Sequence, residues 1–107
     1  MAFGITRKEL YYWKKRAEEG EIAFLTHFWY DDKFFQYSTI TKVACVNKEK
    51  LIDWGKGYGL RPEWIHDRKD YPHFDLFGET QIYILKEENE YEQLLKLERR
   101  RMRRGKI

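Results

Sequence analysis

Residues 22–30 restrict the possible folds of this chain more than any other segment does. They read Ile-Ala-Phe-Leu-Thr-His-Phe-Trp-Tyr, and apolar side chains occupy both of the alternating positions of an extended strand. A strand with one face in water alternates apolar and polar residues, whereas a strand covered on both faces does not. The segment therefore predicts a central strand in a sheet that carries packed structure on each side.

Length and composition place this strand in a small folded domain. The 107 residues are enough for one domain with a single core, and a hydrophobic share of 42% can fill that core. No apolar run approaches the roughly 20 residues of a membrane-spanning helix, and Met1–Lys8 lacks the apolar core of a signal peptide. A single cysteine, Cys45, excludes an internal disulfide and a cysteine-built zinc site. These features predict a cytoplasmic protein.

A helix is predicted before the central strand. Thr6, followed three residues later by Glu9, forms a capping box, and Gly20 is a typical C-terminal stop. Apolar residues recur between them at helical spacing, at Leu10, Trp13 and Ala17. The chain thus enters the sheet from a helix of about three turns.

Two further elements follow the central strand. Residues 31–32 are both aspartate and end it, and a loop over 33–38 leads into a second strand over 39–46 that is rich in β-branched residues. Asn47 is placed to cap a helix over residues 48–58. A strand followed closely by a helix is what a sheet covered by helices requires.

The rest of the chain is predicted to be mostly helical. Pro62 suits the first position of a short helical turn, and residues 67–75 are polar and irregular. The helical pattern resumes at Glu79, and the acid-rich run 87–90 would divide it into two helices. The fold class predicted from these elements is α+β, with helices packed on a small sheet.

Positive charge is concentrated at the C-terminal end. The formal net charge is +3, but residues 96–107 hold seven basic residues against one acid and carry +6, so residues 1–95 carry −3. We therefore predict one domain over residues 1–95 and a basic helical tail over 96–107. The tail would contact nucleic acid or an acidic protein surface, or would simply form a solvated helix end with favourably placed cations. The candidate nucleic-acid contacts are Arg99, Arg100, Arg101, Arg103 and Arg104.

Histidines and carboxylates gather in two parts of the chain. His27 lies four residues before Asp31, His66 is followed by Asp67, and His73 and Asp75 share one side of an extended segment. The three histidines with Asp31, Asp32 and Asp75 would suffice for a metal site if they converge in space. An imidazole beside a carboxylate is a common way to build a general base or a divalent-metal site. None of these spacings is an established zinc motif, and the alternative is that His73 and Asp75 fasten the loop by hydrogen bonds.

Two short motifs carry a resemblance to known proteins. Residues 58–65 read Tyr-Gly-Leu-Arg-Pro-Glu-Trp-Ile, and residues 71–76 read Tyr-Pro-His-Phe-Asp-Leu. With the opening residues 1–5 and the start of the central strand at 22–27, they make the chain resemble the YneQ-like small bacterial proteins. The resemblance covers most of residues 1–98.

Residues 41–75 are more distantly similar to a broader domain-of-unknown-function family. That family shows an Arg-x-x-Trp turn and a Pro-His-Tyr-Asp segment, and Phe74 stands here in place of its tyrosine. The matching positions in this chain are Arg61, Trp64, Pro72, His73 and Asp75. The resemblance implies a shared fold element and a candidate pocket, and it implies no reaction.

We expect this pocket to bind an anionic ligand. Lys42 and Arg61 would hold a phosphate, and Trp64 would stack on a base or brace the pocket wall. His73, oriented by Asp75, would donate a hydrogen bond or act as a general base. The candidate ligand-binding residues are His27, Lys42, Arg61, Trp64, His73 and Asp75.

Several functions stay open on the sequence alone. The preferred one is a nucleic-acid or nucleotide binding module, because no catalytic motif is complete. The alternatives are a small metal-dependent hydrolase or nuclease that uses His27, Asp31, His73 and Asp75, and a protein–protein adaptor. The sequence identifies no cofactor, and it allows a homodimer or another protein partner.

Overall fold

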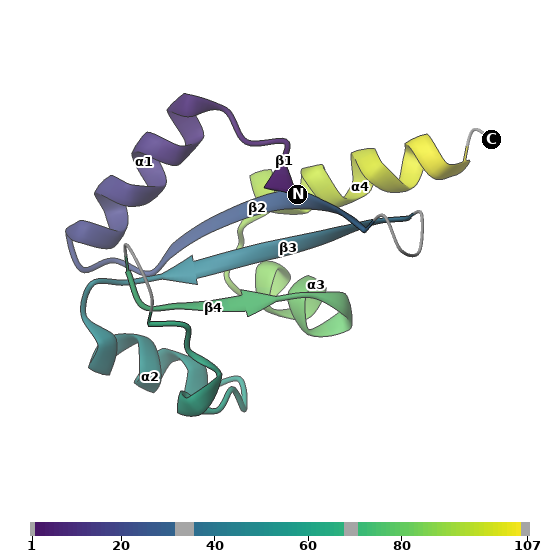
Figure 1. The fold of residues 1–107 in the computed structure, drawn as a ribbon. Helices are drawn as coiled ribbons and strands as arrows, with labels where there is room; N and C mark the ends of the chain where they lie inside the picture. Colours follow the sequence, from purple (N-terminus) through teal and green to yellow (C-terminus); the bar gives the residue numbers. More distant parts are fainter. Residues whose placement is uncertain (1, 32–35, 68–70, 106–107) are drawn as a thin grey trace.

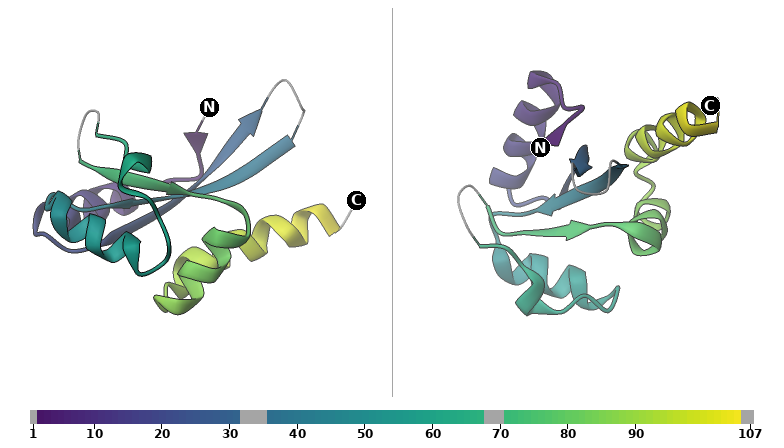
Figure 2. Two further views of the ribbon diagram at one scale, coloured as in Figure 1. Left: turned by 90° about the horizontal axis from the view of Figure 1, so that it is seen from below. Right: turned by 45° about the vertical axis from the view of Figure 1, so that its right-hand side comes forward.

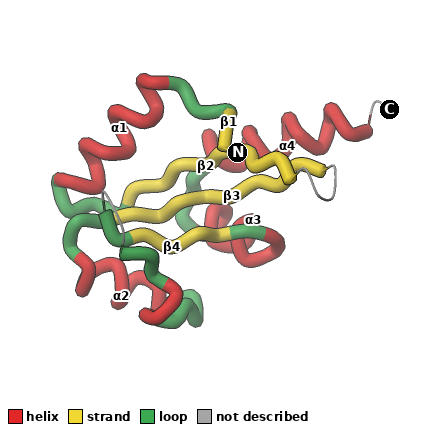
Figure 3. Tube along the Cα trace, viewed as in Figure 1, coloured by secondary structure: helices red, strands yellow, loops and turns green. Residues whose placement is uncertain are grey.

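The computed structural model describes residues 2–31, 36–67 and 71–105. Within these ranges four antiparallel strands form one sheet, in the order β1–β2–β3–β4 (Figure 1; Figure 3). The strands are β1 (Ala2–Phe3), β2 (Ala23–Asp31), β3 (Gln36–Ala44) and β4 (His73–Leu76). The helical elements are α1 (Arg7–Glu18), α2 (Lys48–Lys56), the 3-10 turn η1 (Pro62–Trp64), α3 (Gly78–Glu87) and α4 (Tyr91–Gly105).

β2 lies inside the sheet and is covered on both faces, as its sequence predicts. It is flanked by β1 and β3, and helices pack on the two sides of the sheet (Figure 2). On one face, α1 contributes to a small core whose buried residues are Trp13, Ala17, Ala23, Leu25 and Ala44. The expected α+β class is therefore confirmed.

The larger core lies on the opposite face, between the sheet and the helices α2 and α3, which Figure 1 shows on that side. Its buried residues include Phe24, Val43, Leu51, Phe74, Ile84 and Leu85. A row of hydrogen-bonded polar side chains also crosses this face. Thr26 Oγ1 lies 2.7 Å from Thr41 Oγ1, and the side-chain amide of Gln81 contacts Thr41 Oγ1 at 2.8 Å. The buried hydroxyls therefore satisfy one another instead of facing apolar atoms.

Most of the local signals in the sequence are confirmed. The side chain of Thr6 accepts a hydrogen bond from the backbone N–H of Glu9, and Glu9 accepts one from the backbone N–H of Thr6. Asn47 caps α2 through its side chain. The break between α3 and α4 falls within residues 87–90, where Asn89 has a φ of 57°.

The second strand begins and ends earlier in the chain than its sequence predicts. β3 runs over Gln36–Ala44, so the end of the predicted loop 33–38 belongs to the strand, and the strand ends before residue 46. The register continues to the pair Asp31–Gln36, which means that pairing with β2 overrides the weak local pattern. Residues 32–35 lie outside the described part of the chain.

The segment 67–75 was wrongly predicted to be irregular throughout. Its end forms β4, in which His73 and Asp75 pair in register with Ala44 and Lys42 of β3. Four residues, two of them polar, give no strand pattern, and only the buried position of Phe74 beside Val43 makes the pairing favourable. β1 was not predicted either, because two residues are too few to show a strand pattern.

α4 joins the body of the domain to the basic end of the chain. Its helix runs without a break from Tyr91 to Gly105 and so crosses the predicted boundary between residues 95 and 96. In the part of the chain that the structure describes, no helix is both long and apolar enough to cross a membrane.

Candidate functional site

Four of the predicted site residues share one face of the sheet. Lys42 is in register with Leu25 of β2 and with Asp75 of β4, and side chains in register point to the same side. His27 lies two residues after Leu25, and His73 lies two residues before Asp75, so strand alternation puts both on this face. It is the face that α1 covers near Leu25.

His66 joins this group, although it is not among the ligand-binding residues predicted from the sequence. Its backbone forms an isolated bridge with His73, with hydrogen bonds of 2.8 and 3.0 Å, and the two rings stack with centroids 5.3 Å apart. Asp75 lies beside both rings: its Oδ2 is 3.3 Å from His66 Nε2, and its Oδ1 is 3.8 Å from His73 Nε2. No spacing in the sequence connects His66 with Asp75, because their neighbourhood depends on the bridge.

The ring of His73 is held by the backbone. Its Nδ1 lies 3.0 Å from the carbonyl oxygen of Tyr71, which fixes the orientation of the imidazole. Asp75 Oδ1 is buried and has no hydrogen-bond partner among the described residues. Asp75 was expected to orient His73, but the distance between the carboxylate and this ring is 3.8 Å. The carboxylate lies closer to His66, at 3.3 Å.

His27 is isolated within the same face. The residue is only 3% exposed, and neither ring nitrogen has a hydrogen-bond partner in the described part of the molecule. Burial and then the nearby charge of Lys42 lower the pKa of His27, so the ring is neutral at pH 7. His27 is therefore a buried neutral group.

The metal-dependent alternative finds no support in this geometry. Among the described residues, no three His, Cys, Asp or Glu side chains converge in an arrangement that would hold a metal ion. Asp31 is the last residue of β2, four positions beyond His27 along the strand, and it does not approach β4 in the register. Asp32 lies outside the described residues.

A groove of about 720 Å³ runs along the outer edge of β4. Trp64 and Phe77 border it and are 52% and 67% exposed. Its other lining residues are Ile40, Leu60, Glu63, Ile65, His66, Phe74, Asp75, Leu76 and Thr80. Trp64 and Asp75, both predicted site residues, are thus brought together at this groove.

Arg61 lies apart from the other predicted site residues. Its guanidinium pairs with Glu63 at 3.1 Å and does not line the groove. Its neighbour Leu60 packs into the core beneath α2, whereas Lys42 lies on the face that α1 covers. The two cations predicted to hold one anionic group are therefore on different sides of the sheet.

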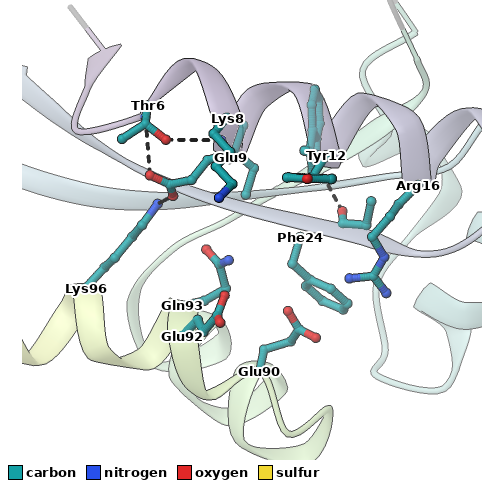
Figure 4. A pocket seen from close by; sticks show the side chains of 13 residues that line it. Thr6, Lys8, Glu9, Tyr12, Arg16, Phe24, Glu90, Glu92, Gln93 and Lys96 are labelled. Atoms are coloured by element: carbon teal, nitrogen blue, oxygen red, sulfur yellow. Dashed lines mark hydrogen bonds and ion pairs between the residues drawn. The ribbon is translucent and has the colours of Figure 1, made fainter.

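A second cavity, of about 320 Å³, lies between α1 and α4 above β2 (Figure 4). Lys96 reaches across it to Glu9 in the first turn of α1 and also donates a 2.7 Å hydrogen bond to the carbonyl oxygen of Thr26. The side-chain oxygen of Gln93 accepts a 2.8 Å hydrogen bond from the N–H of Thr26. Lys96, predicted to begin the basic tail, is thus part of the folded body.

Two carboxylates of this cavity have shifted pKa values in opposite directions. Burial raises the pKa of Glu9, but hydrogen bonds with Lys96 and Thr6 outweigh it, so that the net shift is downward. Burial raises the pKa of Glu90, whose side chain points into the cavity opposite Arg16 (Figure 4). Cations and carboxylates are mixed around this cavity, which gives it no single charge preference.

The five arginines of the tail lie on the last turns of α4. Leu94 and Leu97 pack against the larger core and fix the first half of the helix to the domain. Beyond them the helix continues to Gly105, and its end extends away from the sheet in each view (Figure 1; Figure 2). Arg99, Arg100, Arg101, Arg103 and Arg104 are on this helical extension.

Comparison with known proteins finds a relative that matches nearly the whole chain. The protein described as "Uncharacterized protein YneQ" from Bacillus subtilis (strain 168) is 53% identical over 96 residues, which cover 90% of this chain and 97% of the relative. No protein-family model matches the sequence, and no solved structure matches it significantly. The resemblance to the YneQ-like proteins is confirmed, and the more distant similarity of residues 41–75 to a broader family stays a prediction.

Proposed function

The chain belongs to the YneQ family, and from its own architecture we propose that it binds nucleic acid through the basic C-terminal part of α4. The observation that carries this proposal is a continuous helix that is anchored at one end and bears five arginines at the other. Arginine contacts phosphates with several donors at once and remains charged at all physiological pH values.

The anchoring of α4 supports this role. Gln93 and Lys96 bind the backbone of Thr26, and Leu97 packs on the core, so the arginines begin two residues after the last fixed position. A helix already formed loses less conformational entropy on binding than a disordered tail does. The separation of charge, +6 over residues 96–107 and −3 over the rest, also directs an anionic polymer to the tail.

The pocket predicted from the sequence is a weaker candidate for the same ligand. Arg61 is paired with Glu63, and Lys42 lies in register with Asp75. Each cation that was expected to hold a phosphate therefore has a carboxylate as its neighbour, and the two lie on different sides of the sheet. We propose a cytoplasmic location for the protein, which agrees with a buried free thiol at Cys45.

Binding of single-stranded and duplex DNA and RNA at several salt concentrations tests the proposal. The test variant replaces the five arginines, from Arg99 to Arg104, with glutamine in the full chain. The control variant removes the same number of positive charges from exposed positions on the body, namely Arg7, Lys8, Lys15, Lys56 and Lys86. Both variants have the same net charge, so a difference between them reports the location of the charge.

We expect salt-dependent binding by the parent protein and the control variant, with at least a tenfold loss in the tail variant. The logarithm of the binding constant should fall with the logarithm of the salt concentration by roughly 0.7 to 0.9 for each phosphate contacted. Equal losses in the two variants would attribute binding to net charge alone. Absence of binding by the parent at low salt would refute the proposal.

A further inference from the structure

The groove beside β4 occupies the place of a missing strand. His66 and His73 form an antiparallel bridge in which each residue donates a backbone hydrogen bond to the other. If the chain before His66 remained extended, residue 64 would stand opposite Asp75. Instead, Pro62 begins the 3-10 turn η1, which takes residues 62–64 out of the plane of the sheet.

The edge of β4 is consequently open at Asp75. The N–H and C=O of His73 point outward to His66, and in a strand the groups of every second residue point the same way. The N–H and C=O of Asp75 therefore point outward too, and no described segment forms a backbone hydrogen bond with them. An exposed edge of this kind pairs readily with an added strand.

The walls of the groove fit alternate side chains of such a strand. A residue opposite Asp75 would share its face of the sheet and lie beside its carboxylate. The two adjacent residues would point to the other face, toward Phe74, Leu76 and the apolar walls formed by Leu60 and Ile65. The exposed rings of Trp64 and Phe77 would be covered in the process.

The charge of the groove favours a cationic residue opposite Asp75 in an added strand. The groove is lined by two carboxylates, Glu63 and Asp75, and by no lysine or arginine among the described residues. Arg61, which pairs with Glu63, is outside the lining. Asp75 lies in register with Lys42, and its Oδ2 is 3.3 Å from His66 Nε2. Its Oδ1 has no hydrogen-bond partner among the described residues, so a cationic donor opposite Asp75 would supply one.

We propose that this groove binds a short extended peptide of a partner protein by strand addition to β4. The peptide carries lysine or arginine opposite Asp75 and apolar residues on either side of it. The main-chain hydrogen bonds supply affinity, and the alternation of apolar, basic and apolar side chains supplies specificity. This interaction is separate from nucleic-acid binding by α4.

Selection from a random nine-residue peptide library against the full-length protein tests the proposal. We expect enrichment of peptides that contain a basic residue between two apolar residues. Synthetic versions of the enriched peptides should bind at least tenfold more weakly to Asp75→Asn and Trp64→Ala variants. N-methylation of the peptide residue opposite Asp75 should have a similar effect, because it removes the donor of the main-chain bond.

Matched controls separate groove binding from general attraction. Asp53→Asn changes an exposed carboxylate on α2, and Tyr11→Ala removes an exposed ring on α1, and both should leave peptide affinity unchanged. Circular dichroism checks that each variant is folded, and Phe77→Ser replaces Trp64→Ala if the latter unfolds. No enrichment, enrichment of acidic peptides, or equal affinity for the groove and control variants would overturn the proposal.

Discussion

The side chain of Gln93 in α4 accepts a 2.8 Å hydrogen bond from the backbone N–H of Thr26 in β2. Lys96, one helical turn further along, donates to the carbonyl oxygen of the same residue at 2.7 Å. β1 pairs with residues 28–29 of β2, and among the described residues the backbone of Thr26 has no strand partner on that side. Two side chains of a helix therefore replace one residue of a strand and fix α4 to the sheet.

Replacing Gln93 with leucine should destabilise the protein by about 1–3 kcal/mol, because it leaves a buried N–H without an acceptor. Urea unfolding measured by circular dichroism gives the free energy. The control is Glu92→Gln on the exposed part of the same helix, which should change stability by less than about 0.5 kcal/mol. An unaffected unfolding midpoint in Gln93→Leu would show that the hydrogen bond does not anchor α4.

Gly55→Ala should also destabilise the protein, by about 1–3 kcal/mol. A Cβ at this position would lie 2.7 Å from Cζ of Phe74, which is buried and cannot move freely. The steric cost should exceed the gain of roughly 1 kcal/mol in helix propensity. Gly57→Ala is the matched control, because the nearest atom would be 3.4 Å away, and it should be neutral or slightly stabilising. Equal effects of the two substitutions in urea unfolding would contradict the close packing of Gly55 on Phe74.

The Glu9–Lys96 ion pair should make stability depend on pH in the acidic range. The pKa of Glu9 is below its ordinary value of 4.5 in the folded state, so its contribution is present above about pH 4.5 and is lost as the pH falls through the folded-state pKa. The free energy of unfolding should therefore fall more steeply below pH 5 in the parent than in Glu9→Gln. Parallel pH profiles would argue against a contribution from this pair.

His27 should produce a second pH dependence at higher pH. Burial and the charge of Lys42 lower its pKa below 6.5, so the folded state favours the neutral ring and the unfolded state binds the proton more readily. Stability should fall as the pH decreases from 6.5 through the folded-state pKa. His27→Leu removes two unpartnered ring nitrogens, and it should be at least as stable as the parent at pH 7 and relatively more stable at pH 5. Unfolding curves of the parent and the variant at the two pH values measure this effect. If the stability difference between the two proteins were the same at pH 5 and pH 7, it would contradict a buried neutral imidazole.

Local sequence signals were reliable where neighbouring residues supply the stabilising contacts. The capping box of Thr6 and Glu9 and the cap at Asn47 depend on atoms within three residues, so the starts of α1 and α2 were predictable. The pattern of residues 22–30 was equally informative, since burial of both faces follows from the composition of the strand itself. The helical break within residues 87–90 belongs to the same group of local effects.

The candidate site could be predicted only in part. Strand alternation correctly placed His73 and Asp75 on one side, and the register then brought Lys42 beside them. The contact of His66 with Asp75 was not predicted, because it requires the bridge to His73. Arg61 was grouped with Lys42 because both are cations near the same motifs in the sequence, although a sheet separates them in space.

Residue patterns along the chain were enough to predict the class of the fold, the starts of α1 and α2, the central strand and the concentration of arginine at the end of α4. Three features became visible only in the folded chain: β4 belongs to the sheet, Lys96 binds to the body of the domain, and the edge of β4 is open at Asp75. The two groups of features differ in the sequence distance over which their interactions act. Caps, periodicity and net charge depend on residues a few positions apart, whereas register, edge pairing and long side-chain hydrogen bonds join residues that are distant in sequence.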